Sequence, residues 1–322
     1  MVKTRIIITG GSGFIGTNLV EFYCKNNIDV INLDISKPKK KNHMKFWEKV
    51  DILNKVELKK CMMKINPDYV IHLAARTDLD GKNLHDYIVN TEGVQNVLDV
   101  LKEILSVKKA IFASSMLVCK NGYNPKDSND YNPDTFYGES KVIGEEIIKN
   151  YQIDAFGLII VRPTSIWGPW FDIPYAQFFK SIQKGRFVKF GNKLCTKTFG
   201  YVGNTVHQIN GLLFLNEKIS KYDIFYLGDS PPLNISDWSD LISKYMGVKK
   251  PIRLPFFIVK LISSFGDIVN KLNFNFPLNS TRLSNMTTNN IKKLDNIKKY
   301  VNQRYSIEEG IEKTVDWLNK DK

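Results

Sequence analysis

Arg5-Ile6-Ile7-Ile8-Thr9-Gly10-Gly11-Ser12-Gly13-Phe14-Ile15-Gly16 is the stretch of this chain that decides its fold. Its first half is an apolar, β-branched run typical of a buried strand, and its glycine turn leads into helical periodicity over residues 17–25. Gly10 permits the tight turn, Gly13 lets the backbone approach a pyrophosphate, and Gly16 lets the helix pack on the strand. The N–H groups at the helix start, at Phe14 and Ile15, can hold phosphates. The stretch therefore predicts a dinucleotide site.

Asp34 closes the second β-branched run, residues 30–33. Its carboxylate can accept hydrogen bonds from both hydroxyls of an adenosine ribose and would repel a 2′-phosphate, which favours NAD as the cofactor. The nearby Lys37, Lys39 and Lys40 leave NADP open. A competing interpretation is that Asp34 merely ends a strand, where Asp is common.

Short β-branched runs alternate with segments of helical periodicity in the first half of the chain. The expected strands are residues 5–9, 30–33, 69–73, 110–113 and 157–161. This alternation predicts an α/β fold of the Rossmann type, a doubly wound parallel sheet with helices on both faces. After Arg162, prolines break the pattern into short pieces, which indicates a smaller mixed lobe. We expect a cofactor domain over residues 1–165, to which segments near 199–230 return, and a substrate lobe over 166–322.

Composition narrows the class of protein. The chain has 322 residues, 43% of them hydrophobic, and no apolar stretch long enough to span a bilayer, so we expect a soluble protein. Its start lacks the zones of a secretory signal, which favours the cytoplasm. The cysteines and histidines lack ligand-like spacing, so no metal is expected. The net charge of +13 favours an anionic substrate, such as a nucleotide diphosphate, over nucleic acid.

Residues 254–265 are more apolar than their neighbours. The segment is short and carries a charge at Lys260. We therefore expect a buried amphipathic helix here rather than a helix that lies on a membrane surface.

Three side chains are candidates for catalysis. Tyr137 and Lys141 are four residues apart, which places them on one face of a helix expected to begin near Asp134. The cation is expected to lower the Tyr pKa, so that the phenol can exchange a proton with a substrate hydroxyl or carbonyl. Ser115 follows the fourth expected strand, and in doubly wound sheets ligands bind at the carboxyl ends of strands. Its hydroxyl would hydrogen-bond the reacting oxygen, although it could also serve only the backbone of a turn.

These features occur in one order with several others, and together they resemble the extended short-chain dehydrogenase/reductase family in its nucleotide-sugar epimerase/dehydratase branch. The resemblance covers nearly the whole chain and rests on residues 9–16, Asp34, Asp51-Ile52, His72-Leu73-Ala74-Ala75, Asn90, Ser115, Tyr137, Lys141 and Arg162-Pro163. It implies that Asp51 and Ile52 meet the adenine and that Leu73, Ala74 and Ala75 line the diphosphate and ribose. Asn90 and Pro163 join the cofactor site, while Ser115, Tyr137 and Lys141 form the triad. It also implies a homodimer and a structural His72.

Departures from the family pattern narrow the reaction. The Asp-Glu pair of the family's dehydratases is replaced by Met116 and Leu117, which cannot act as acid or base, so dehydration is disfavoured. Ser165 stands where an Asn often contacts the substrate, and Met116 also lies at that side. The usual Arg clamp on the substrate diphosphate corresponds to Lys197, which lacks a bidentate fork. Arg282 is a second candidate clamp.

Four functions remain open. The leading hypothesis is an NAD-dependent epimerase of a nucleotide-diphosphate sugar that uses a transient keto intermediate, with Tyr137 as acid and base. The second is an NAD(P)H-dependent reductase of a 4-keto nucleotide sugar, which would use the same residues. A 3β-hydroxysteroid dehydrogenase-like enzyme and a non-catalytic cofactor sensor are the others. The intact Tyr137 and Lys141 disfavour the sensor.

Overall fold

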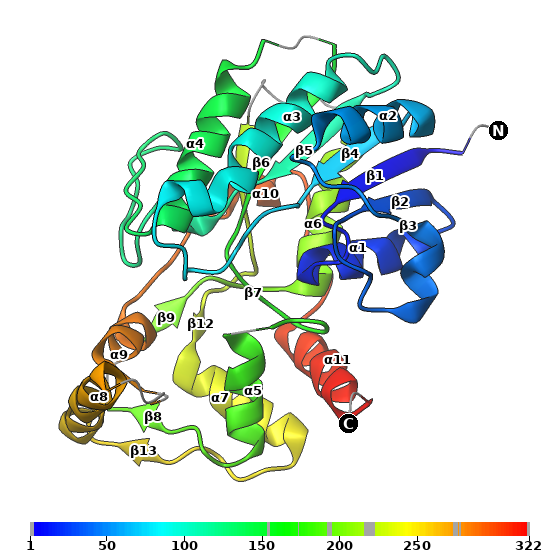
Figure 1. The fold of residues 1–322 in the computed structure, drawn as a ribbon. Helices are drawn as coiled ribbons and strands as arrows, with labels where there is room; N and C mark the ends of the chain where they lie inside the picture. The colour runs from blue at the N-terminus through cyan, green and yellow to red at the C-terminus, as the bar shows by residue number, and fades with distance from the viewer. Residues whose placement is uncertain are drawn as a thin grey trace.

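The computed structural model describes residues 3–152, 155–172, 174–191, 195–215, 223–272, 276 and 278–320. Within them, every helix falls short of the length and apolarity that crossing a bilayer requires. The chain forms two regions, a large sheet covered by helices and a smaller lobe (Figure 1).

The described residues form a central sheet of seven strands in the order β11-β6-β5-β4-β1-β2-β3, and each pairing is parallel. The strands are β1 (Arg5–Thr9), β2 (Asp29–Leu33), β3 (Trp47–Glu48), β4 (Tyr69–His72), β5 (Lys109–Ala113), β6 (Gly157–Pro163) and β11 (Asp223–Leu227). Because the chain moves from β1 to β2 on one side and places β4 on the other, the sheet reverses its order between β1 and β4. The predicted fold class is confirmed, and the expected strands agree with the observed ones within two residues.

Helices cover both faces of this sheet (Figure 1). They are α1 (Phe14–Lys25), α2 (Lys55–Ile65), α3 (Glu92–Leu101), α4 (Phe136–Asn150) and α6 (Val202–Leu213), with the short α10 (Asp295–Lys298) beside β11. Three 3₁₀ helices accompany them: η1 (Lys41–Phe46), η2 (Leu84–Asn90) and η3 (Met116–Val118). Alternate residues of β1 enter opposite cores: Ile7 packs with α2, α3 and α4, whereas Ile6 and Ile8 pack with α1 and α6. Such double burial explains the continuous apolar run.

The smaller lobe is built from short elements. They are β7 (Ser165–Trp167), α5 (Tyr175–Gln183), β8 (Lys189–Phe190), β9 (Thr196–Lys197), β10 (Phe199–Tyr201), β12 (Leu233–Asn234), α7 (Ile235–Met246), β13 (Arg253–Leu254), α8 (Phe256–Lys271), α9 (Ser280–Thr287) and α11 (Ile307–Lys320). Its core is aromatic: Trp238 contacts the rings of Trp167, Phe179 and Phe199 at centroid distances of 5.3, 5.7 and 4.5 Å. Although β11 and α6 lie with the large sheet, the division near residue 165 stays a prediction.

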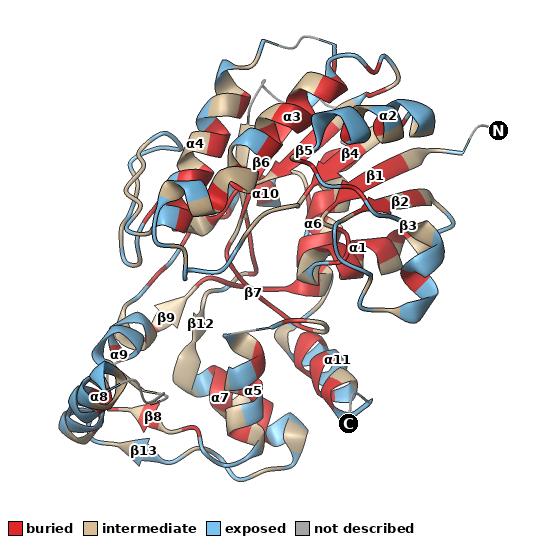
Figure 2. Ribbon diagram, viewed as in Figure 1, coloured by how far each residue is buried: buried red, intermediate tan, exposed pale blue. Residues whose placement is uncertain are grey.

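The expectation of a buried helix over residues 254–265 is wrong about the burial of the helix. The segment is helical as α8, but Phe257, Leu261 and Phe265 are 65%, 67% and 58% exposed. Figure 2 shows most of α8 in the colour of exposed residues at the edge of the smaller lobe. The buried side of α8 contains small residues, Ser263 and Gly266, because the backbone of Leu278 passes close to it.

Candidate active site

The glycine turn lies at the point where the sheet reverses its order. Thr9 ends β1 beside His72, which ends β4, and Leu73 N donates to Thr9 O at 2.9 Å. Gly10 has φ +76°, and a Cβ built there would lie 2.5 Å from Ala74 N. A side chain at Gly10 would be strained by the left-handed backbone conformation, and it would also collide with the chain after β4. Only glycine therefore fits at this position.

The loop then enters α1, and Asp34 lies against it. Gly13 is the N-cap of α1, so the first N–H groups of the helix, from Phe14 to Gly16, face the carboxyl end of the sheet. Asp34 Oδ2 accepts from Ser12 N at 3.0 Å and Oδ1 accepts from Ser36 N at 2.8 Å. Burial raises the pKa of Asp34, and these two hydrogen bonds oppose that rise.

The residues after β4 and β3 complete a cradle that fits a dinucleotide. Leu73, Ala74 and Ala75 are half-buried directly beside Gly10, where small residues leave room for a backbone-bound diphosphate. Asp51 is exposed, and its Oδ1 accepts from Leu53 N at 2.9 Å. Ile52 is 4% exposed, so much of its side chain belongs to the core beneath the expected adenine position.

Asn90 links this cradle to α4, the helix that carries Tyr137 and Lys141. Its Oδ1 accepts from Arg76 N at 2.9 Å, while its Nδ2 donates to Arg76 O at 2.9 Å and to Ser140 Oγ at 3.0 Å. These bonds fix the chain just after Ala75 against α4. In this arrangement Asn90 shapes the predicted cofactor site through its neighbours.

The three candidate catalytic residues come together. Thr135 caps α4 by accepting from Gly138 N at 3.0 Å, and Tyr137 and Lys141 lie on the buried face of that helix. Ser115 follows β5, accepts from Leu117 N at 3.1 Å and also hydrogen-bonds the Tyr137 hydroxyl. The structure thus brings Ser115, Tyr137 and Lys141 to the carboxyl end of β5, as the resemblance implied.

The electrostatics differ from the sequence-based expectation. Burial raises the pKa of Tyr137, and the hydrogen bond from Ser115 partly lowers it, whereas Lys141 is not among the causes. Burial also lowers the pKa of Lys141 to about 8, with the Glu145 carboxylate acting against this, and Lys141 Nζ donates to Ala113 O at 3.0 Å. The expectation that the ammonium lowers the Tyr137 pKa is therefore wrong for this structure, because the cation is directed toward the end of β5.

Sequence reasoning missed a buried ion pair behind the catalytic helix. Arg162 Nε and Nη2 donate to the two carboxylate oxygens of Glu145 at 2.7 Å each, and both side chains are fully buried. Glu145 also accepts from Tyr131 OH at 2.7 Å. The available signal was the spacing of Tyr137, Lys141 and Glu145, which repeats every four residues on the buried face of α4. The pair joins β6 to α4, the helix that carries Tyr137 and Lys141.

The proposed substrate residues lie on four elements: one on η3 beside the large sheet, and three on β7, β9 and α9 of the smaller lobe. Met116 lies in η3 and receives a contact from Asn290 Nδ2 at 3.9 Å. Ser165 is buried and hydrogen-bonds Tyr175. Lys197 Nζ donates to Asn285 O, and burial lowers its pKa. Arg282 is exposed on α9.

Two further features complete the site. His72 is fully buried, its Nδ1 lies 2.7 Å from Thr9 Oγ1, and burial lowers its pKa to about 3, so it is a neutral structural residue. Pro163 ends β6 beside Leu227 of β11. In the part of the chain that the structure describes, no group of three or more His, Cys, Asp or Glu side chains could hold a metal ion.

Comparisons with known proteins identify a family and similar folds. The family described as "NAD dependent epimerase/dehydratase family" matches residues 6–228. An N-acetyl-alpha-D-glucosaminyl-diphospho-ditrans,octacis-undecaprenol 4-epimerase of Escherichia coli O157:H7 is 29% identical over 282 residues, covering 84% of this chain and 81% of the relative. The solved UDP-glucose 4-epimerase of Thermotoga maritima has a TM-score of 0.75 at 21% identity, and covers 99% of each chain. The Bacillus cereus UDP-glucuronic acid 4-epimerase, solved with UDP-glucuronic acid and NAD, has a TM-score of 0.75 at 20% identity and covers 99% of this chain and 100% of that one.

The sheet reversal, the glycine cradle and the Ser-Tyr-Lys cluster define an NAD-dependent enzyme of the extended short-chain dehydrogenase/reductase type. The chain belongs to the NAD dependent epimerase/dehydratase family. The predictions of family, enzyme class and NAD are therefore confirmed, and the relatives and structural neighbours include nucleotide-sugar 4-epimerases.

Proposed function

We propose that this enzyme epimerises a nucleotide-diphosphate sugar through a transient keto sugar. The observation that carries the proposal is the Ser115–Tyr137 hydrogen bond at the carboxyl end of β5, in the same end of the sheet as the glycine cradle. Gly10, Gly13, Gly16 and Asp34 would hold NAD, with Lys141 at its nicotinamide ribose. When bound, NAD supplies the acceptor that takes a hydride from the sugar and gives it back.

Tyr137 would move the proton. A sugar hydroxyl must lose its proton as its carbon loses the hydride, and the Tyr137 oxygen is the group that accepts it. Ser115 donates a hydrogen bond that stabilises the charged form of Tyr137 and can also bind the reacting oxygen. On the return step Tyr137 gives the proton back, and an inverted centre results when the keto sugar presents its other face.

The substrate side supports epimerisation over dehydration. Met116 and Leu117 supply no acid or base, so water is not removed from the sugar. Lys197 lies half-buried in the smaller lobe and supplies a positive charge for a diphosphate. Arg282 and Ser165 are the other proposed contacts.

A second candidate substrate differs only in the carrier of the diphosphate. The Escherichia coli relative is named for a sugar joined through a diphosphate to undecaprenol. The proposed clamp residues here, Lys197 and Arg282, recognise diphosphate charge and not a nucleotide base. We therefore propose a polyprenol-linked sugar as the alternative substrate for the same chemistry.

The test begins with the nucleotide that the purified protein retains. Mass spectrometry of the denatured protein should find NAD, which the epimerase cycle regenerates. An empty site, or one with NADPH, would instead support the reductase.

Tyr137→Phe should then reduce turnover of a nucleotide sugar by at least about 100-fold, because proton transfer is lost. NAD should still be retained. Tyr151→Phe is the matched control, since it removes a hydroxyl from the far end of α4 that bonds Asp99. Activity of Tyr137→Phe within a few-fold of the natural protein would sink the proton-transfer role.

We also propose a homodimer. A hollow at α3 and α4 is lined by Ile143, Ile147 and Tyr151 and by the polar side chains of Gln95, Glu146 and Asn150. The cytoplasmic location expected from the sequence stays a prediction.

A further inference from the structure

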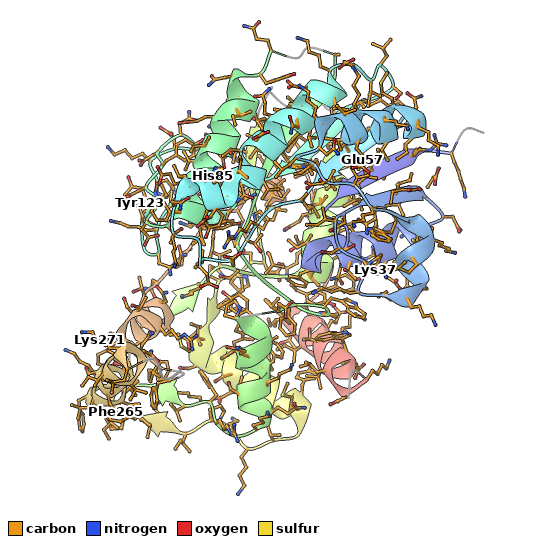
Figure 3. All side chains as sticks on the ribbon, viewed as in Figure 1. Lys37, Glu57, His85, Tyr123, Phe265 and Lys271 are labelled. Carbon is orange, nitrogen blue, oxygen red and sulfur yellow. The ribbon has the colours of Figure 1, made fainter. Side chains whose placement is uncertain are left out.

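The outer side of α8 carries a continuous row of large apolar side chains. The row, here called the α8 stripe, consists of Phe257, Leu261, Phe265, Ile268 and Leu272, which are 65%, 67%, 58%, 59% and 65% exposed. Their spacing of three and four residues places them along one side of the helix over about 20 Å. In Figure 3, Phe265 projects from the rim of the smaller lobe.

The opposite side of α8 faces the protein. Its buried residues are Val259, Ser263 and Gly266, and the helix packs there against α9. An ordinary surface helix has the reverse pattern, with its large apolar residues toward the core. The α8 stripe is therefore an exposed apolar patch of the kind that marks an interaction surface.

Positive charge exceeds negative charge beside the stripe and in the segment before it. Residues 249–272 contain Lys249, Lys250, Arg253, Lys260 and Lys271 against one acid, Asp267. All five cations are exposed, and Lys260 and Lys271 lie along one edge of α8. The carboxylate of Asp267 is hydrogen-bonded to the start of α9: it accepts from Ser280 N at 3.0 Å and from Ser280 Oγ at 2.5 Å. The surface thus offers apolar side chains beside an excess of positive charge, in which the single carboxylate, Asp267, is close to Lys271.

From this arrangement we propose that α8 docks the enzyme on an anionic lipid surface. The α8 stripe enters the boundary between headgroups and acyl chains, while Lys260, Lys271 and the cations before the helix contact lipid phosphates. The helix lies in the plane of the surface and does not cross it. The proposal goes beyond the catalytic one and does not depend on the identity of the sugar.

A second copy of the chain fits this surface less well. Two α8 helices paired antiparallel about Phe265 would place Lys260 of one copy near Lys271 of the other, since the same edges meet in such a pair. Like charges at that distance repel. Lipid phosphates, in contrast, neutralise every cation on this side.

The docked side is also close to the substrate side of the site. α9, which packs on α8, accepts the hydrogen bond from Lys197 through Asn285 O, and Asn290 just beyond α9 contacts Met116. Docking through α8 therefore holds the substrate lobe, rather than the NAD end of the sheet, near the lipid.

Co-sedimentation of the full-length protein with vesicles tests the proposal. One set contains phosphatidylcholine alone and the other adds phosphatidylglycerol. The natural protein should sediment with the anionic set, and added salt should weaken this binding. Leu261→Gln/Phe265→Gln should reduce the partition coefficient at least about tenfold, because two half-exposed apolar side chains no longer enter the lipid. Lys260→Gln/Lys271→Gln should weaken binding to the anionic set alone.

Leu105→Gln is the matched control, since Leu105 is 94% exposed at the far end of the sheet layer. It should bind vesicles as the natural protein does. All variants should keep NAD and turn over a soluble nucleotide sugar normally, so loss of catalysis and loss of docking are read separately. Absence of sedimentation by the natural protein, or equal binding by Leu261→Gln/Phe265→Gln, would overturn the proposal. The proposal would also be overturned if the natural protein did not bind vesicles and Leu261→Gln/Phe265→Gln had a lower molecular mass than the natural protein in solution. That result would assign the α8 stripe to contact between copies of the chain.

Discussion

Gly10 is held by two separate constraints, a left-handed backbone and a collision. Its φ is +76°, and a Cβ would lie 2.5 Å from Ala74 N. Gly185 shares the first constraint, with φ +64°, but a Cβ there meets nothing within 4 Å. The two glycines therefore separate the cost of backbone strain from the cost of close approach.

Gly185→Ala should lower the free energy of unfolding by about 1 kcal/mol, the cost of a positive φ alone. Gly10→Ala should cost clearly more and should also abolish NAD retention, because the chain after β4 must shift. Urea denaturation and mass spectrometry of released nucleotide measure both effects. Equal costs at the two sites would show that the contact with Ala74 does not constrain Gly10.

Lys141 contributes to the site at a cost in stability. Burial lowers its pKa to about 8, whereas an exposed Lys has a pKa near 10.5. Between these two pH values the unfolded chain therefore binds more protons than the folded chain. Burial of Lys141 lowers the free energy of unfolding fully below pH 8, and this destabilisation disappears as the pH rises to about 10.5.

Lys141→Met should therefore raise the melting temperature at pH 7 by about 1–3 °C while it abolishes turnover. The gain should shrink as the pH rises from 8 toward 10.5. Differential scanning calorimetry across that range checks the direction. Lys59→Met, which removes an ammonium from an exposed pair, is the control. A variant that melts below the natural protein at pH 7 would show that the bond from Lys141 to Ala113 O outweighs the burial.

At the scale of elements, α4 is held to β6 by the Glu145–Arg162 pair. Both side chains are fully buried, so the loss of one partner leaves an uncompensated charge in the core. Lys59 and Glu103 form a comparable pair at 2.6 Å on the surface, with side chains 42% and 45% exposed. Solvent screens that pair, and it adds little to stability.

Arg162→Met and Glu145→Met should each lower the free energy of unfolding by about 3–5 kcal/mol, and the double variant should cost less than their sum. Lys59→Met should change it by less than about 0.5 kcal/mol. Chemical denaturation of the four proteins gives the comparison. Additive costs would mean that Glu145 and Arg162 act independently.

Among the helices, α8 departs from the sequence-based expectation, because its large apolar side chains are exposed. Its apolar content predicted a helix, and a helix forms, but composition does not say which side meets the protein. The small residues Ser263 and Gly266 permit close packing on the chain near Leu278, so α8 attaches by its small side. Only the tertiary contact shows that the large apolar residues face outward.

At the scale of the whole molecule, the proposed homodimer and the α8 stripe use different surfaces. The hollow lies on α3 and α4, which cover the large sheet, whereas α8 is at the edge of the smaller lobe (Figure 1). Pairing through α3 and α4 would therefore leave α8 open on both copies.

Size-exclusion chromatography with light scattering should give the mass of two chains. Ile143→Glu/Ile147→Glu should give the mass of one, because charge at the centre of an apolar contact is not tolerated. The exposed Lys59→Glu is the control for added charge. A single-chain mass for the natural protein would contradict the dimer.

The sequence by itself determined the fold class, and it predicted the NAD cradle and the candidate catalytic set. The glycine turn, Asp34 and the spacing of Tyr137 and Lys141 are local patterns, and the order of strands and helices follows from hydrophobic periodicity along the chain. Tertiary structure alone decided the direction of Lys141 toward β5, the buried Glu145–Arg162 pair and the exposure of α8. Each of these depends on which distant segment packs against a side chain, and that packing sets its burial, its hydrogen-bond partner and hence its pKa.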